Sequence, residues 1–209
     1  MLFIIGYILF FLPMILLFPT KVLHKARMPK KGNKCIVTSN HYSNWDCIVY
    51  DIHFARKFRY VAKKELFKNK FVGFILKDIG GIPIDRDQIT PSSFKVTMRE
   101  LKKNHQLFIY PEGTRNKSGG KELLEIKSGI ITFASKGDCE IIPMVIYRKP
   151  KIFRKNYIIV GEPFRIEGEN PARLTKEETD ANLDRYLEVM KNLRNELEDY
   201  IESKKKKTK

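Results

Sequence analysis

Short apolar segments alternate with longer amphipathic ones along most of the chain. The short segments favour buried strands, and they cover residues 35–38, 58–62, 82–84, 107–110, 141–147 and 157–160. The longer segments favour helices, over residues 47–55, 65–77, 91–103 and 129–136. A last helix places a row of apolar residues on one face, made of Leu183, Leu187, Met190, Leu193, Leu197 and Ile201. Strands that alternate with helices predict an α/β domain, with a mostly parallel central sheet flanked by helices.

The first twenty residues depart from this pattern. No charged side chain occurs between Met1 and Lys21, and residues 2–18 are almost wholly apolar. As a helix this stretch would be about 26 Å long, at about 1.5 Å per residue, against a bilayer core of about 30 Å. We therefore expect residues 1–20 to form a short membrane-anchoring hydrophobic helix, which either spans the bilayer or enters one leaflet. A helix packed in a partner protein is the alternative.

The residues after this apolar stretch are strongly basic. Lysine and arginine occupy six positions before the first acidic residue, Asp46, and these are Lys21, Lys25, Arg27, Lys30, Lys31 and Lys34. Such a cluster favours the cytoplasmic side of a membrane and attracts anionic lipids. We expect a membrane-associated protein with its main domain on the cytoplasmic face and membrane lipids among its partners.

Length and charge limit the organisation and the class of partner. The 209 residues suffice for one main domain over residues 21–203 and a basic tail over residues 204–209, which we expect to be disordered. The net charge of +16 implies an anionic partner, which could be a membrane surface, a nucleic acid or a phosphorylated substrate. Because aromatic residues do not interleave with the basic ones in a recognition motif, we expect no nucleic acid.

Cysteine and histidine spacing gives no sign of a metal site. Cys35, Cys47 and Cys139 lie far apart without a C-x-x-C pair, which argues against a disulfide framework and against structural zinc. The histidines include no H-E-x-x-H pair. We therefore expect a domain in a reducing cytosol, with no metal.

The first candidate site follows the first predicted strand, where residues 40–46 read Asn-His-Tyr-Ser-Asn-Trp-Asp. His41 is a candidate base for a hydroxyl, and a carboxylate on its other ring nitrogen would fix the tautomer. Asp46 could supply that carboxylate if the segment is a turn that leads into a helix, because residues five apart on one helix diverge by about 140°. Ser43 or Asn44 could then cap the helix. For this pair alone, a loop histidine and a helix-capping aspartate are the preferred interpretation.

Two further segments suggest phosphate binding. Residues 111–115 read Pro-Glu-Gly-Thr-Arg after another predicted strand. Arg115 could bind a phosphate bidentately, Gly113 would let the backbone approach it, and Glu112 could bind a hydroxyl or hold Arg115. Residues 80–86 supply Arg86 after a strand that Pro83 places at a sheet edge. The alternatives are an exposed ion pair on a turn and a surface arginine.

The order of these segments resembles the glycerolipid acyltransferase family, and most the 1-acyl-glycerol-3-phosphate (lysophosphatidate) acyltransferases. That family has N-H-x-S-x-x-D, then G-x-I-x-I-x-R, then a strand ending F-P-E-G-T-R, then an apolar-Pro-apolar block. This chain matches with residues 40–46, 81–86, 108–115 and 142–144. Residues 63–66 and 127–129 are also similar to the family. Four motifs in the right order are far more specific than any one of them.

The resemblance implies an acyltransferase domain over residues 21–203 that makes phosphatidate in phospholipid biosynthesis. It implies that His41 is the catalytic base with Asp46 as its partner. It also implies substrate binding by Arg86, Glu112, Gly113, Thr114, Arg115 and Lys127. The acyl donor would be acyl-CoA or acyl carrier protein, with no other cofactor and no metal.

Other functions remain open at this level. The same chemistry would serve another lysophospholipid or glycerol 3-phosphate as the acceptor. A covalent acyl intermediate on Ser43 is a further route, although a hydroxyl two residues from His41 is better suited to hydrogen bonding. A non-catalytic, membrane-tethered protein that binds anionic ligands would explain the charge. A phosphohydrolase would require metal ligands, which the sequence does not display.

Overall fold

One mostly parallel sheet forms the centre of the computed structural model, which describes residues 13–78, 80–84, 90–117 and 123–207. Its seven strands among these residues are β1 (Thr20–Leu23), β2 (Cys35–Ser39), β3 (Arg59–Lys63), β4 (Ile82–Ile84), β5 (Gln106–Ile109), β6 (Ile141–Ile146) and β7 (Asn156–Val160). The order across the sheet is β1-β7-β6-β2-β5-β3-β4. All neighbours are parallel except β6 and β7. The predicted fold class is confirmed, and β4 lies at an edge as Pro83 indicated.

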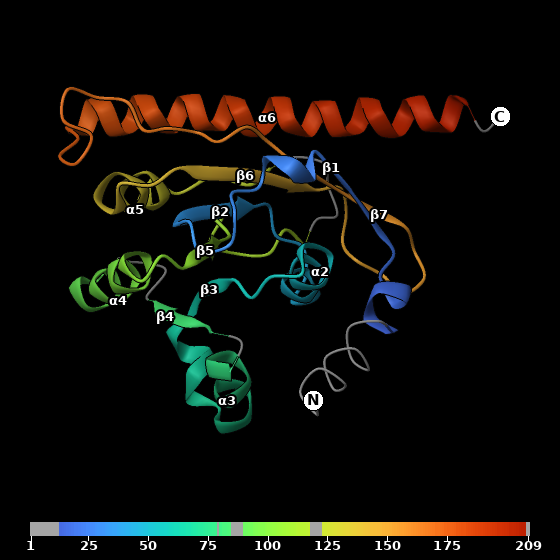
Figure 1. Ribbon diagram of the computed structural model, residues 1–209, viewed down its shortest axis with the longest axis horizontal. Coiled ribbons are helices and arrows are strands. Elements are labelled where there is room, and N and C mark those ends of the chain that lie inside the picture. The colour runs from blue at the N-terminus through green and yellow to red at the C-terminus, as the bar shows by residue number, and fades with distance from the viewer. Residues whose placement is uncertain (1–12, 79, 85–89, 118–122, 208–209) are drawn as a thin grey trace.

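Helices cover both faces of this sheet (Figure 1). They are α2 (Trp45–Phe54), α3 (Lys70–Asp78), α4 (Pro91–Lys102), α5 (Gly129–Gly137) and α6 (Lys176–Lys206), with the short 3-10 helices η1 (Lys25–Arg27) and η2 (Lys64–Lys68). Ile36 and Val37 are adjacent on β2, fully buried, and belong to two different core clusters. One cluster packs under α4, α5 and α6, and the other packs under α2.

The last helix is longer than the sequence pattern predicted. Thr175 caps it, because its side chain accepts from Glu178 N–H (3.1 Å) and the Glu178 carboxylate accepts from Thr175 N–H (2.8 Å). The predicted apolar face packs against the sheet. Lys204, Lys205 and Lys206 continue the helix, so the expectation of a disordered tail was wrong for these three residues. Their side chains fall in the last turn, where positive charge complements the helix dipole.

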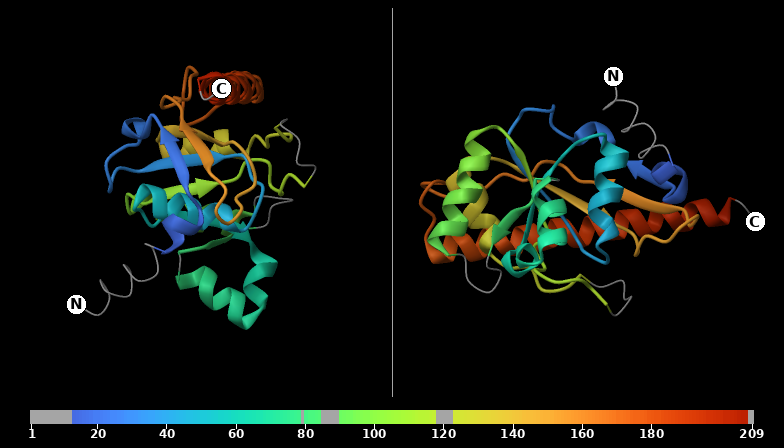
Figure 2. Two further views of the ribbon diagram at one scale, coloured as in Figure 1. Left: turned by 90° about the vertical axis from the view of Figure 1, so that its right-hand side faces the viewer. Right: turned by 90° about the horizontal axis from the view of Figure 1, so that it is seen from below.

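The predicted helix over residues 65–77 is instead two helices joined at Asn69. The Asn69 side chain accepts from the N–H groups of Phe71 (3.1 Å) and Val72 (3.0 Å), which caps α3 and separates it from η2. This pair projects from the sheet on the side opposite α6 (Figures 1 and 2).

The predicted membrane-anchoring helix lies mostly outside the described residues, since residues 1–12 are not among them. Residues 13–17 are helical, and Met14 and Phe18 are buried in the core cluster under α2. Within the described ranges, no helix combines the length and the apolar character that crossing a membrane requires.

Candidate active site

The two sequence motifs meet at one edge of the sheet. β2 and β5 are parallel neighbours, so the segments that follow Ser39 and Ile109 leave the sheet side by side. The Asn116 N–H donates to the His41 carbonyl oxygen at 2.7 Å and links the two loops directly. Sites in such sheets form at the carboxyl ends of the strands, and both motifs directly follow a strand, as the sequence indicated.

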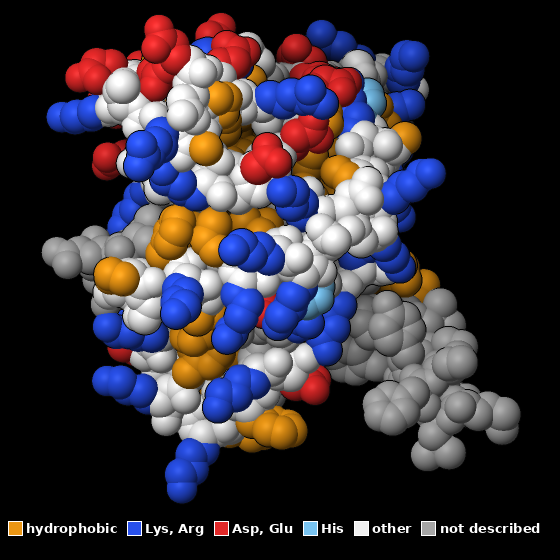
Figure 3. Space-filling model, turned by 60° about the vertical axis from the view of Figure 1, so that its left-hand side comes forward, with side chains coloured by type: hydrophobic (Ala, Val, Ile, Leu, Met, Phe, Trp, Pro, Cys, Tyr) orange, Lys and Arg blue, Asp and Glu red, His pale blue; other side chains and the backbone are white. Residues whose placement is uncertain are grey.

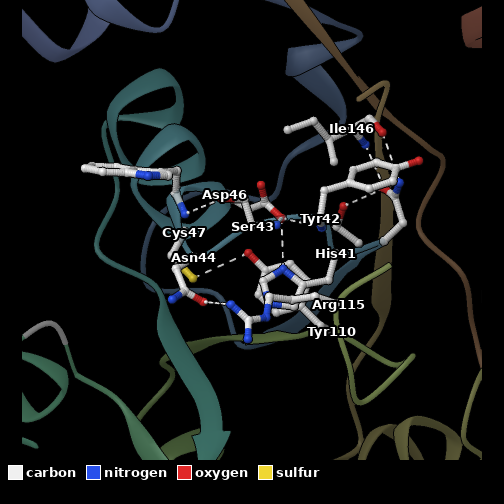
Figure 4. A network of polar contacts seen from close by, with 12 residues as sticks. His41, Tyr42, Ser43, Asn44, Asp46, Cys47, Tyr110, Arg115 and Ile146 are labelled. Atoms are coloured by element: carbon white, nitrogen blue, oxygen red, sulfur yellow. Dashed lines mark hydrogen bonds and ion pairs between the residues drawn. The ribbon is translucent and has the colours of Figure 1, made fainter. Parts of the chain in front are cut away.

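His41 and Asp46 form the predicted pair (Figure 4). Asp46 lies in the first turn of α2 and is fully buried, and its Oδ2 is 2.9 Å from His41 Nδ1. The same oxygen accepts from the N–H groups of Tyr42 (2.7 Å) and Ser43 (2.8 Å). Because Asp46 Oδ2 already accepts from two backbone N–H groups, His41 Nδ1 donates to it, and in the neutral imidazole Nε2 then carries the lone pair. Of the two suggested caps, Ser43 accepts from Trp45 N–H (3.3 Å), while Asn44 precedes the helix without a side-chain cap bond.

Tyr110 holds the plane of the His41 imidazole. The two rings are stacked with centroids 3.8 Å apart and planes at 16°. Tyr110 is buried, and its hydroxyl lies 3.5 Å from Cys47 Sγ. Burial raises the pKa of Tyr110 well above its usual range, so the ring is neutral. The sequence pattern marked Tyr110 only as the end of a strand, because stacking on a histidine 69 positions away leaves no local signal.

Glu112 joins the two motifs instead of pairing with Arg115. Its carboxylate accepts from His41 N–H (3.4 Å) and from Leu124 N–H (3.4 Å). Burial, with the charge of Asp46 as a lesser cause, raises the pKa of Glu112 to about 7. Arg115 instead donates from Nη1 to Asn44 Oδ1 at 3.1 Å. The described contacts do not pair Glu112 with Arg115, and they position the His41 backbone. The predicted bond from Glu112 to a substrate hydroxyl stays a prediction.

Two of the predicted substrate-binding residues, Gly113 and Lys127, lie close together. Gly113 has a φ of 66°, and an added Cβ would stand 3.2 Å from Lys127 Cε. The Lys127 N–H donates to the Pro111 carbonyl oxygen at 3.1 Å. Thr114 and Arg115 are exposed on the same loop. Arg86 lies outside the described residues, so its predicted role stays a prediction.

An apolar pocket opens beside these residues. Its cavity volume is about 60 Å³. Its lining comes from β3, β4, β5, the second motif and α5, and consists of Val61, Ile84, Ile109, Tyr110, Pro111, Gly113, Lys127, Gly129, Ile130 and Phe133. An apolar wall with one cation at its mouth suits a molecule that has both a hydrocarbon part and an anionic part.

Residues that the sequence reasoning missed support the site from behind. Asn40 donates from Nδ2 to the Ile146 carbonyl (3.0 Å) and accepts from Ile146 N–H (2.9 Å), which joins the end of β2 to β6. Arg194 of α6 is buried, and its Nη1 donates to the carbonyls of Tyr147 (2.9 Å) and Ile146 (3.3 Å). Its Nη1 also lies 3.5 Å from the Tyr42 hydroxyl. The sequence gives one signal for Arg194, which is a charged residue next to the apolar face of a long helix.

Nucleophilic cysteine chemistry is disfavoured at this site. Burial raises the pKa of the Cys47 thiol to about 12, which keeps it protonated and weakly nucleophilic near neutral pH. Within the described part of the chain, no three side chains of the His, Cys, Asp and Glu types gather into a possible metal site.

Residues 20–147 match the acyltransferase family, and this span is more than half of the chain. The protein belongs to that family. It is 33% identical over 157 residues to the 1-acyl-sn-glycerol-3-phosphate acyltransferase of Bacillus subtilis, covering 68% of this chain and 72% of the relative. It is 40% identical over 124 residues to the enzyme of the same name from Helicobacter pylori, covering 58% of this chain and 52% of the relative. The chain thus spans about half the length of the Helicobacter relative.

The fold is also found in a solved structure. The crystal structure of the 1-acyl-sn-glycerophosphate (LPA) acyltransferase from Thermotoga maritima aligns with a TM-score of 0.63 and 23% sequence identity. The alignment covers 86% of this chain and 72% of that chain. This likeness concerns the fold, and it agrees with the parallel sheet described above.

Proposed function

We propose that this protein transfers an acyl group from an acyl thioester to the free hydroxyl of 1-acyl-glycerol-3-phosphate. The product is phosphatidate, a precursor in phospholipid biosynthesis. The observation that carries the chemistry is the 2.9 Å contact between His41 Nδ1 and Asp46 Oδ2, since it leaves Nε2 free to act as a base. The choice of acceptor is supported by the names of the Bacillus and Helicobacter relatives.

The reaction follows from this pair. His41 Nε2 removes the proton of the acceptor hydroxyl as its oxygen attacks the thioester carbonyl carbon. Asp46 accepts from Nδ1 and stabilises the positive charge that develops on the imidazole. Attack on the carbonyl carbon gives a tetrahedral intermediate. Its carbon–sulfur bond then breaks, and the leaving thiolate takes up the proton that His41 holds. A thiolate is a good leaving group, so this step needs little acid catalysis.

The acceptor is bound at the loop that follows β5. Arg115, two residues after Gly113, and Lys127, whose side chain lies next to it, are exposed cations. The missing side chain of Gly113 lets a phosphate approach the backbone. Arg86 would add a third cation, as the family resemblance implies. The apolar pocket beside Lys127 would take hydrocarbon of the substrate.

The proposal also covers the acyl donor and the place of the enzyme in the cell. Acyl-CoA and acyl carrier protein both present the same thioester, and either fits the chemistry of His41. The enzyme is membrane-associated through residues 1–20, with the catalytic domain on the cytoplasmic face, because the apolar N-terminal stretch is followed by six basic residues. A related acceptor such as another lysophospholipid would preserve the mechanism.

An acceptor panel tests the proposal. Purified protein in mixed micelles would receive acyl-CoA or acyl carrier protein together with lysophosphatidate, lysophosphatidylethanolamine, glycerol 3-phosphate or monoacylglycerol. Mass spectrometry of the lipid products would identify the acylated species. We expect phosphatidate to form fastest and monoacylglycerol, which lacks the phosphate, to react poorly. Equal rates with monoacylglycerol and lysophosphatidate would contradict phosphate recognition, and faster acylation of another lysophospholipid would replace the acceptor.

A further inference from the structure

The exposed apolar side chains are unevenly distributed over the molecule. Large hydrophobic residues are exposed at nine described positions: Ile15, Leu16, Trp45, Leu66, Phe71, Val72, Phe74, Ile152 and Phe153. Four of them lie in η2 and α3, and none lies in α4, α5 or α6. Phe71 and Phe74 are 73% and 71% exposed. Apolar side chains that gather on one segment mark a surface that contacts an apolar phase or partner.

Phe71 and Phe74 are exposed although α3 is a regular, capped helix that packs on η2. Asn69 caps the first turn of α3. A Cβ on Gly73 would stand 2.6 Å from the Phe67 carbonyl oxygen, so the glycine allows α3 to pack directly on η2. Phe71 and Phe74 are three positions apart and therefore share one side of α3. The packing of Gly73 thus fixes which way the two rings point.

The charges of this segment only partly serve helix stability, since Lys77 lies in the last turn of α3 and complements its dipole but other charges do not. Residues 63–78 contain five lysines and two acidic residues. Lys70 is the first residue of α3 and Asp78 is the last, which is the reverse of the arrangement that complements a helix dipole. In Figure 3, basic and hydrophobic side chains are interspersed over the lower part of the molecule, at the height of α3 in Figure 1, while acidic side chains gather at the top, at the height of α6.

We propose that η2 and α3 form a second membrane contact, which docks on an anionic lipid surface. Phe71 and Phe74 enter the boundary between headgroups and acyl chains, and the surrounding lysines bind the headgroups. Interfacial helices combine these features, with aromatic residues on one side and lysine on the other. A second copy of the chain is a poorer occupant, because the lysines of the two copies would face each other.

Docking of η2 and α3 would bring the site to the bilayer. β3 ends at Lys63 and leads directly into η2, and it pairs with β5, whose end carries Tyr110. Val61 of β3 and Ile84 of β4 line the apolar pocket, so the η2–α3 segment connects two walls of that pocket. If the proposed function holds, the acceptor passes from the bilayer to His41 without leaving the membrane surface.

A fluorescence experiment on the full chain tests the docking. Trp45 is the single tryptophan, so a Trp45→Phe background permits one reporter at a time. One protein carries Phe74→Trp, and a matched control carries Lys191→Trp on exposed α6. Vesicles of phosphatidylglycerol with brominated acyl chains quench a tryptophan only where it reaches the acyl region. This local readout does not depend on how residues 1–20 bind.

The Phe74→Trp reporter should lose intensity and shift to shorter wavelength on these vesicles, while the Lys191→Trp reporter should not. Brominated phosphatidylcholine vesicles should quench the Phe74→Trp reporter less than phosphatidylglycerol vesicles do. Lys70→Gln together with Lys77→Gln should abolish this difference in quenching between the two lipids. The same change at Lys176 and Lys191 of α6 should preserve this difference. Equal quenching of both reporters would overturn the proposal. So would a concentration-dependent blue shift without vesicles, because it would indicate contact between copies.

Catalysis gives a separate test of acceptor entry. Phe71→Ser with Phe74→Ser should raise the apparent KM for lysophosphatidate in vesicles more than for a short-chain, monomeric acceptor, with kcat unchanged. Quenching without any acyl transfer would leave the membrane contact standing and refute the proposed function. An equal rise in KM for both acceptors would refute entry from the bilayer.

Discussion

Replacement of Asp46 by asparagine isolates the charge at the centre of the site. The asparagine oxygen can keep the hydrogen bonds from Tyr42 N–H and Ser43 N–H and the contact with His41, which all involve Asp46 Oδ2. What is lost is the negative charge that stabilises the positive imidazole during the reaction. Both side chains are buried, so solvent screens this interaction weakly.

The size of the effect can be worked from the contact. With about 4 Å between charge centres and an effective dielectric constant of about 20, the attraction is about 4 kcal/mol. At about 1.4 kcal/mol per tenfold change in rate, Asp46→Asn should lower kcat about 10³-fold. The assay is initial-rate release of the donor thiol with saturating lysophosphatidate.

Asp51→Asn is the matched control, since Asp51 lies on the same helix and its carboxylate also accepts a side-chain hydrogen bond, away from His41. Its Oδ1 accepts from the Tyr60 hydroxyl at 2.8 Å, and burial raises its pKa to about 7. This variant should keep kcat within a few-fold of the wild type. The reasoning is refuted if Asp46→Asn loses less than tenfold while both variants unfold at similar temperatures, or if Asp51→Asn loses as much.

Three further changes test the surroundings of the pair. Tyr110→Leu removes the ring stacked on His41, worth about 1 kcal/mol, so kcat should fall about fivefold to tenfold, whereas Tyr110→Phe should retain most activity. Glu112 has a raised pKa of about 7, so ionisation favours the unfolded state. The free energy of unfolding of the wild type should therefore fall relative to Glu112→Gln, by up to about 3 kcal/mol, as the pH rises from about 4.5 to 7; urea titrations that show no such trend would contradict this. Arg194→Met removes the described side-chain donor to the Tyr147 carbonyl, while the Ile146 carbonyl keeps its bond from Asn40. The change should cost about 1–3 kcal/mol in the same titrations. A loss below about 0.5 kcal/mol would show that this buried cation does not support the site.

Much of the sheet could be predicted because its central strands are buried on both faces. Residues such as Ile36, Val37, Leu107 and Ile142 are fully buried, so their segments are continuous apolar runs with clear ends. β1 escaped prediction because its residues are partly exposed at a sheet edge. The break at Asn69 also escaped, since the apolar periodicity continues through it and only the capping bonds reveal a new helix.

In the site, too, local sequence patterns could be predicted, but contacts between distant residues could not. His41 and Asp46 could be paired from their spacing, and the two loops could be brought together because parallel strands end at one edge. The roles of Tyr110, Asn40 and Arg194 depend on contacts between distant parts of the chain. Arg194 lies 152 positions from Tyr42, and nothing in the local sequence of either residue indicates that they meet.

The central claim is that His41 is the base for acyl transfer, and single-turnover acylation of lysophosphatidate tests it most directly. The measurement compares wild type, His41→Ala and the control His105→Ala, whose histidine lies just before the amino end of β5, away from the site. His41→Ala should lower the rate of phosphatidate formation by about 10²–10⁴-fold, while His105→Ala should match the wild type. A His41→Ala rate within a few-fold of wild type would contradict the account.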